Sequence, residues 1–153
     1  MPRISNIELL NTAEQPALTI RTRTSVDKLP MVIGQGFGQL AAHLGALGAH
    51  LANVPFVAYH NMDMADLDVE LGFPVDGPLT GSGGIRYAPV PSGLRVFCMY
   101  LGPYSAMRPV YDETAAWITS HGYSPAGAAY EYYYNGPGTP EEQLLTQIVM
   151  PLK

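Results

Sequence analysis

The chain repeats itself, and one carboxylate interrupts the repeat. Residues 40–61 align without a gap on residues 114–135, at a constant offset of 74 positions. Where the first segment has Val57 the second has Glu131, the only acid in the strand-like segment 128–134. A duplicated scaffold with one unmatched acid among tyrosines indicates a binding site at the seam between two similar halves. The identical pairs are Ala41/Ala115, Ala42/Ala116, Gly48/Gly122, Ala52/Ala126, Tyr59/Tyr133 and Asn61/Asn135.

Hydrophobic periodicity predicts the same order of elements in each half, namely strand, helix, strand, strand. Apolar residues at three- and four-residue spacing predict helices over residues 28–51 and 110–121, the second of which ends at Gly122. Two such modules predict an α+β fold in which one antiparallel sheet carries both helices on one face, with a groove between the helices. The predicted strands are 5–24 (bent near 14–16), 54–61, 66–75, 94–101, 129–135 and 144–152.

Length and composition predict one domain. The chain has 153 residues, of which 47% are hydrophobic and 14% charged, enough apolar surface for a core of its own. Within this single domain we expect module one over about residues 1–76, a Gly-rich linker over 77–84 and module two over about 85–153.

Charge and cysteine content exclude several classes of protein. The net charge is −5 and the basic residues are scattered, so no nucleic-acid surface is expected. The single cysteine, Cys98, lies in an apolar run and predicts a buried thiol without disulfide or zinc. Neither a signal peptide nor a membrane-length apolar run is evident, which favours a cytoplasmic protein.

No metal site or cofactor is predicted. The four histidines lack ligand spacing, and the acidic run over residues 63–70 lacks the glycine and terminal glutamate of a calcium loop. We interpret that run as a solvated turn and strand face. The glycines over 34–38 resemble a dinucleotide fingerprint only loosely and do not directly follow a strand.

The strand around Glu131 holds the candidate site. Because side chains alternate along a strand, Glu131 and Tyr133 point one way, and Tyr130, Tyr132 and Tyr134 point the other. A carboxylate in apolar surroundings favours a cationic ligand or acid/base chemistry. Two alternatives stay open: the Tyr130 face lines the groove instead, or Glu131 merely bonds a tyrosine or pairs with Arg95 or Arg86. The predicted ligand-binding residues are Glu131, Tyr133, Tyr59, Tyr104, Tyr111, Trp117, Phe37 and Val57.

Several segments, spread over the whole chain, resemble the GyrI-like small-molecule-binding domain family. In the second half these are GPY at 102–104, HGY at 121–123, YEYYYNGP at 130–137 and TPEE at 139–142; in the first half they are PFVAYHN at 55–61 and LDVELGFPV at 67–75.

The resemblance implies a ligand held between the two helices, with Glu131 and Tyr133 contacting cationic, lipophilic aromatic compounds. Two departures stand out. The first module has SVDKLPM at 25–31 where the family has GPY, and no DNA-binding segment precedes the domain, so direct DNA binding is not expected.

Three functions follow as hypotheses. The first is a stand-alone protein that sequesters or senses lipophilic, cationic aromatic molecules, with a homodimer as one possible state. The second is a hydrolase of strained electrophilic, cyclopropane-type natural products, with Glu131 as general base and Tyr133 or Tyr104 assisting. The third, implied by the resemblance alone, is a gyrase-inhibitor-like interaction module.

Overall fold

Antiparallel strands and two long helices build the chain, in a computed structural model that describes residues 3–136 and 138–153. The α+β class predicted from the sequence is confirmed. In chain order the elements are β1 (Glu8–Thr12), β2 (Ala17–Thr24), α1 (Leu29–Leu47), β3 (Phe56–Tyr59), β4 (Leu67–Pro74), β5 (Ile85–Tyr87), β6 (Gly93–Leu101), the 3-10 turn η1 (Tyr104–Ala106), α2 (Arg108–Ser120), β7 (Ala129–Tyr133), the 3-10 turn η2 (Glu141–Gln143) and β8 (Leu145–Pro151).

The chain divides into two units, which we describe separately. One comprises Met1–Thr12 and Gly93–Lys153, and the other comprises Ala13–Ser92. We call them the outer-sequence unit and the inner-sequence unit, because the first contains both ends of the sequence. Each has four antiparallel strands and one long helix.

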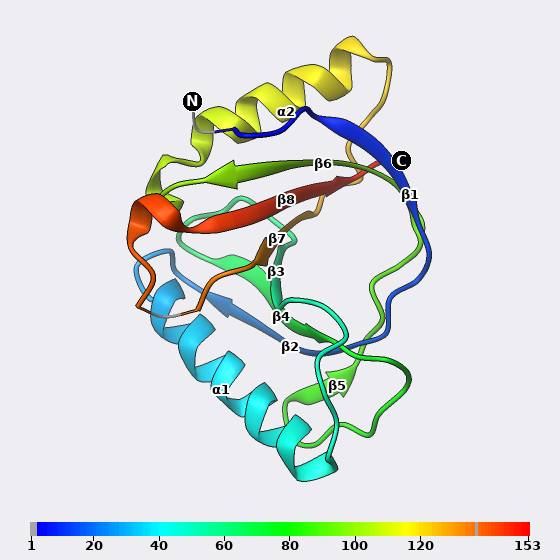
Figure 1. The fold of residues 1–153 in the computed structure, drawn as a ribbon, viewed down its shortest axis with the longest axis vertical. Helices are drawn as coiled ribbons and strands as arrows, with labels where there is room; N and C mark the ends of the chain where they lie inside the picture. Colours follow the sequence, from blue (N-terminus) through cyan, green and yellow to red (C-terminus); the bar gives the residue numbers. More distant parts are fainter. Residues whose placement is uncertain (1–2, 137) are drawn as a thin grey trace. The chain divides into compact units, whose positions relative to one another are not determined.

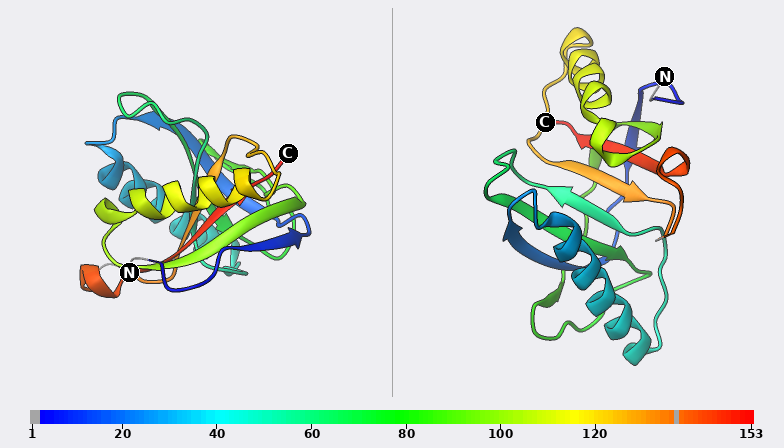
Figure 2. Two further views of the ribbon diagram at one scale, coloured as in Figure 1. Left: turned by 90° about the horizontal axis from the view of Figure 1, so that it is seen from above. Right: turned by 90° about the vertical axis from the view of Figure 1, so that its left-hand side faces the viewer.

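In the inner-sequence unit the strands run in the order β3, β4, β2, β5, and α1 packs on β2 and β4. The right-hand view of Figure 2 shows α1 lying across these strands. The helix approaches the sheet closely at Gly36, where an added Cβ would lie 2.7 Å from a methyl carbon of Leu71. Glycine at this position therefore allows the close contact between helix and sheet.

Helix α1 has clear signals at both ends. Pro30 lies in its first turn, where its missing N–H costs no hydrogen bond. Gly48 follows with φ of 67°, and its N–H bonds the carbonyl groups of Leu44 and Gly45. Because a left-handed residue cannot continue a helix, α1 ends before residue 51, where the periodicity had predicted the end.

In the outer-sequence unit the strands run in the order β1, β6, β8, β7. Figure 1 shows α2 alongside β6. A core of buried side chains fills this interface, and Ile7 and Tyr111 pack against it at the edge. The core residues are Cys98, Tyr100, Met107, Val110 and Ile148. The predicted buried thiol is confirmed, and burial raises the pKa of Cys98.

Two segments depart from the predicted modules. The expected bent strand over 5–24 is two strands with different partners, since β1 pairs with β6 and β2 pairs with β4. The Gly-rich segment 77–84 connects β4 to β5 inside the inner-sequence unit, because β5 pairs with β2. Local hydrophobic alternation predicts a strand but carries no information about its distant partner.

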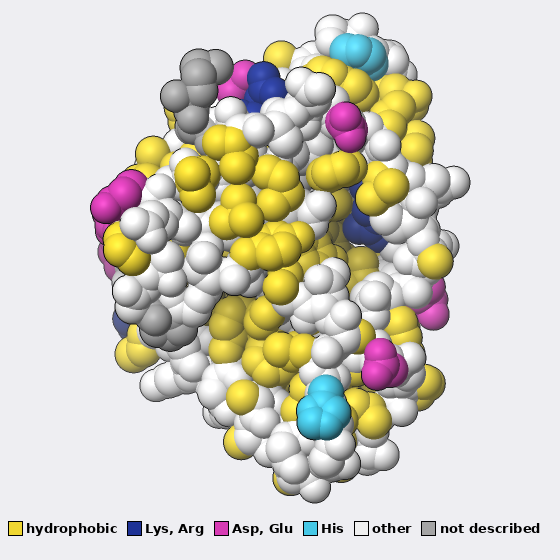
Figure 3. All heavy atoms as spheres, in the orientation of Figure 1, with side chains coloured by type: hydrophobic (Ala, Val, Ile, Leu, Met, Phe, Trp, Pro, Cys, Tyr) yellow, Lys and Arg dark blue, Asp and Glu magenta, His cyan; other side chains and the backbone are white. Residues whose placement is uncertain are grey.

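Apolar side chains reach the surface in several places. Figure 3 shows hydrophobic side chains over much of the visible face, with few charged groups among them. The most exposed large ones are Met62, Met31, Ile4, Met64 and Tyr104. Across the described residues, no helix is both long and apolar enough to cross a membrane.

Candidate functional site

A buried glutamate lies on the face of the outer-sequence unit that α2 covers. Glu131 is the middle residue of β7 and stands opposite Ile148, a core residue of β8. Only 8% of Glu131 is exposed. Because a buried carboxylate loses its hydration, it needs hydrogen-bond donors or positive charge around it.

Two tyrosine hydroxyls donate to this carboxylate. The hydroxyl of Tyr133 lies 2.7 Å from Oε1, and that of Tyr111 lies 2.5 Å from Oε2. Tyr133 reaches Glu131 because residues two apart on a strand share a face. Tyr111 reaches it from the first turns of α2. Each carboxylate oxygen thus accepts a hydrogen bond, one from the strand and one from the helix.

A third tyrosine, Tyr104, packs on Tyr133 and is partly exposed to solvent. The rings of Tyr104 and Tyr133 meet edge to face, with centroids 5.4 Å apart, and Tyr104 is 47% exposed. Partial burial raises the pKa of Tyr104, and the negative charge of Glu131 raises it further. Tyr104 follows Gly102, whose φ of 146° lies in the region that favours glycine. The GPY segment therefore positions Tyr104 at the start of the turn η1.

The opposite face of the same strands has a different character. Cys98, Ile148 and Glu131 are cross-strand partners and lie on the α2 face. Arg95 is three residues from Cys98 and so lies on the other face, where its guanidinium is 5.6 Å from the ring centre of Tyr130. The side chain of Arg95 also donates to Thr12, at 2.8 Å. These contacts place Arg95 and Glu131 on opposite faces of the sheet.

Tyr130 and Tyr132 share this second face and stack with ring centroids 6.4 Å apart. Burial raises the pKa of Tyr132 to about 12, in part offset by Arg95. The question of which face carries Glu131 is thereby answered, and the second alternative is realised in part, since Glu131 bonds tyrosines and does not share a face with Arg95. The α2 face carries Glu131 and Tyr133, and the Tyr130 face turns away from that helix.

Trp117 lies elsewhere on the outer-sequence unit. Its ring stacks on His121, with centroids 3.8 Å apart. It lines an open hollow of about 380 Å³ together with Arg3, Asn6, Ile7 and Glu8. Its neighbours there come from the segment around β1, which is at the other end of the strand order from β7. That Trp117 contacts a ligand stays a prediction.

Three predicted site residues belong to the inner-sequence unit. Val57, the counterpart of Glu131, is fully buried in β3, and Tyr59 is half-buried at the end of that strand. Phe37 of α1 packs on Phe73, with ring centroids 5.5 Å apart. Their contribution to ligand binding also stays a prediction. The Pro137 end of the YEYYYNGP segment lies outside the described residues.

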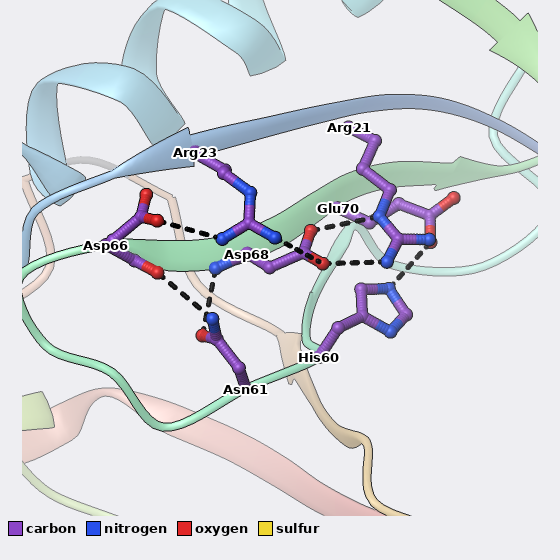
Figure 4. Close-up of polar contacts among 7 residues, drawn as sticks. All are labelled: Arg21, Arg23, His60, Asn61, Asp66, Asp68 and Glu70. Carbon is purple, nitrogen blue, oxygen red and sulfur yellow. Dashed lines mark hydrogen bonds and ion pairs between the residues drawn. The ribbon is translucent and has the colours of Figure 1, made fainter.

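The acidic run of the inner-sequence unit forms a network with arginines and a histidine (Figure 4). Arg21 donates two hydrogen bonds to Asp68, at 3.0 and 2.8 Å, and these hold the pKa of Asp68 below its ordinary value. His60 lies 2.9 Å from Glu70. Burial alone would raise the pKa of Glu70, but the hydrogen bond from His60 and the charge of Arg21 outweigh it and the pKa is lowered.

Only part of this network is solvent-exposed: the side chain of Asp66 is 56% exposed, whereas that of Glu70 is 13% exposed. Asp66 and Asp68 pair with the arginines of β2, and Glu70 pairs with His60, which follows β3. Asn61 bonds the backbone of Asp66 and Asp68. Among the described residues, no group of three or more His, Cys, Asp or Glu side chains is placed to hold a metal ion.

One polar residue near Glu131 was not predicted from the sequence. Thr146 of β8 stands opposite Tyr133 and lies on the same face as Ile148. It is fully buried, and its hydroxyl has no hydrogen-bond partner within the part of the chain that the structure describes. A threonine in a strand is an ordinary residue, so only the pairing register of β8 reveals its position next to the tyrosines.

The structure is an antiparallel α+β fold with a buried carboxylate that accepts hydrogen bonds from two tyrosines. The chain belongs to the GyrI-like family: residues 5–153 match the GyrI-like small molecule binding domain. The resemblance noted in the sequence is confirmed by this match. No curated protein matches the sequence.

Solved structures share the fold. The EcmrR C-terminal domain superposes with a TM-score of 0.75 at 19% identity, over 98% of each chain. EcmrR in its complex with DNA gives a TM-score of 0.84 at 21% identity, and this chain covers 58% of that longer one. A hydrolase from Listeria innocua gives 0.71 at 12% identity, over 100% of this chain and 94% of that one. SAV2435 bound to tetraphenylphosphonium gives 0.59 at 16% identity, over 97% and 94%. At these identities the similarity establishes the fold alone.

Proposed function

We propose that this domain binds lipophilic, cationic aromatic molecules, which it sequesters or senses. The observation that carries the proposal is the buried carboxylate of Glu131 with a tyrosine hydroxyl on each oxygen. The family supports small-molecule binding. SAV2435, a protein of the same fold, has a solved structure in which it is bound to the lipophilic cation tetraphenylphosphonium.

The geometry favours a cation whose positive charge needs no direct hydrogen bond to Glu131. Both oxygens of Glu131 already accept a hydrogen bond, so a ligand interacts with the charge mainly through space. At about 5 Å and an effective dielectric constant of about 20, that attraction is worth about 3 kcal/mol. The rings of Tyr104 and Tyr133 supply apolar area and negative ring faces, which suit quaternary and delocalised cations.

Titration of a charged and an uncharged ligand tests the proposal. We expect Glu131→Gln to weaken tetraphenylphosphonium binding by tenfold to a hundredfold, on the order of the charge attraction above. Triphenylphosphine oxide, which is similar in shape but neutral, is expected to bind both proteins alike. Glu141→Gln makes the same chemical change at an exposed position of the same unit and serves as control. Equal affinity of wild type and Glu131→Gln for the cation would refute the charge pairing.

A hydrolase is the second candidate. The contact between the Tyr133 hydroxyl and Glu131 favours it, since a hydrogen-bonded acid and phenol are a common pair in proton transfer. One fact weighs against it: hydrogen bonds from two tyrosines stabilise the ionised form of Glu131 and so make it a weaker base. Incubation with cyclopropane-type electrophiles, followed by mass spectrometry, tests this activity. Turnover that Glu131→Gln abolishes would establish the hydrolase in place of the binding protein.

A cytoplasmic location and a homodimer remain predictions. Light scattering of the purified protein, with and without ligand, measures the oligomeric state directly.

A further inference from the structure

Thr146 has an uncommitted hydroxyl beside the tyrosines of the Glu131 site. Its side chain is fully buried, and the hydroxyl oxygen has no hydrogen-bond partner among the described residues. Buried polar groups in folded proteins are nearly always paired, so an unpaired one calls for an explanation.

The neighbouring tyrosines cannot donate to this hydroxyl. In the strand register Thr146 lies between Tyr100 of β6 and Tyr133 of β7. Each phenol has one proton to donate. Tyr100 donates it to the carbonyl of Pro103, at 2.5 Å, and Tyr133 donates it to Glu131. Both donors are committed.

The position of Thr146 places it near the charge. Glu131 stands opposite Ile148, and Thr146 is two residues further along β8, on the same face. Diagonal neighbours of this kind lie about 7–8 Å apart between Cα atoms, somewhat less between Cβ atoms. An aromatic cation is longer than that distance. A ligand whose charge lies near Glu131 therefore extends over Thr146 when its long axis follows this diagonal.

We propose that Thr146 determines specificity at the Glu131 site, by hydrogen bonding an oxygen or N–H group of the bound cation. This inference rests on the proposed function. It narrows the ligand class from lipophilic cations in general to those that also carry a polar atom one ring away from the positive charge. The half-exposed Tyr104, whose ring packs on Tyr133, lies on the solvent side of this tyrosine pair.

Two lipophilic cations separate the role of Thr146 from the role of the charge. Rhodamine 6G carries N–H groups and an ester carbonyl, whereas tetraphenylphosphonium has no hydrogen-bonding atom. Thr146→Val removes the hydroxyl and keeps a branched side chain that suits a strand. We expect it to weaken rhodamine 6G binding about tenfold, the effect of about 1.4 kcal/mol, and to change tetraphenylphosphonium binding less than twofold.

Matched variants complete the design. Thr146→Ser keeps the hydroxyl and should retain most of the rhodamine 6G affinity. Thr114→Val removes a buried hydroxyl that donates to the carbonyl of Val110 in its own helix. It should change the binding of neither rhodamine 6G nor tetraphenylphosphonium. A thermal melt of each variant reports folding, and Thr146→Val should melt no lower than wild type, because it removes an unpaired polar group.

The outcomes distinguish the two proposals. Suppose that both cations bind wild type and that Glu131→Gln lowers both affinities. If Thr146→Val then lowers neither affinity, or lowers both equally, the role of Thr146 is refuted and the proposed function stands. If neither cation binds wild type, the proposed function fails, and the inference about Thr146 fails with it. A selective loss of rhodamine 6G in Thr146→Val, restored in Thr146→Ser, establishes the inference.

Discussion

Tyr111 of α2 and Glu131 of β7 are 20 positions apart in the sequence and share a hydrogen bond of 2.5 Å. The bond ties the helix of the outer-sequence unit to its strand β7 through a charged group. Hydrogen bonds to charged, buried groups are stronger than those between neutral groups. The stability of this unit therefore depends on the same carboxylate to which we assign ligand binding in the proposed function.

Removing the Tyr111 hydroxyl should destabilise the protein. We expect Tyr111→Phe to lower the free energy of unfolding by about 1–3 kcal/mol, because Oε2 of buried Glu131 loses its donor. Tyr134→Phe removes the hydroxyl of an exposed tyrosine of the same unit and should change it by less than about 0.5 kcal/mol. Urea denaturation measures both, and equal losses would contradict a special role for Tyr111.

The ionisation of Tyr104 should report the charge of Glu131. Burial and that charge both raise the pKa of Tyr104. Glu131→Gln removes the charge, so the pKa of Tyr104 should fall toward its ordinary value of 10.0 while staying above it, since burial is the larger cause. Carbon-13 NMR of labelled tyrosines during a pH titration measures this shift. An unchanged pKa would mean that the two groups do not interact.

Acid should weaken the inner-sequence unit through Glu70. Its pKa in the folded protein is below the ordinary value of 4.5, so its contribution to stability is fully present above that value. The contribution is lost as the pH falls below 4.5 and through the folded-state pKa, when Glu70 is protonated and its ion pair with His60 is broken. Glu70→Gln should flatten this acid limb of the unfolding free energy between about pH 5 and pH 3. An acid limb of the same slope in both proteins would assign it to other carboxylates, of which Asp68 is the first to examine.

Two glycine substitutions should have opposite effects. An added Cβ at Gly72 in β4 would lie 2.0 Å from the ring of Phe56 on the paired strand, so Gly72→Ala should cost about 1–3 kcal/mol of stability. Gly34 in α1 has open space around it, and Gly34→Ala should add up to about 1 kcal/mol through helix propensity. Thermal unfolding distinguishes the two, and a neutral Gly72→Ala would show that Phe56 moves freely.

Much of the site could be predicted because it depends on local periodicity. Strand alternation placed Glu131 and Tyr133 on one face, and Tyr111 was predicted as a helix residue of the same site, which its hydrogen bond to Glu131 now joins to that pair. The repeat singles out Glu131 because its counterpart is the apolar residue Val57, which the structure buries.

What could not be predicted depends on strand pairing. The separation of residues 5–24 into β1 and β2, the pairing of β5 with β2, and the position of Thr146 opposite Tyr133 all follow from register between distant segments. Which face of β7 meets α2 required knowledge of where the helix packs. Hydrophobic patterns in a single sequence do not encode these relationships.

The pairing of β1 with β6 has a consequence for how the chain is made. Thr12 and Gly93 are partners 81 residues apart, and the whole of the inner-sequence unit lies between them. During synthesis that unit emerges from the ribosome as one continuous stretch, whereas β1 is synthesised long before its partner strand β6. Closing so long a loop carries an entropic cost, which is smaller once the intervening segment is already compact. Because residues 13–92 lie between two paired strands in the sequence, we expect them to fold before β1 pairs with β6.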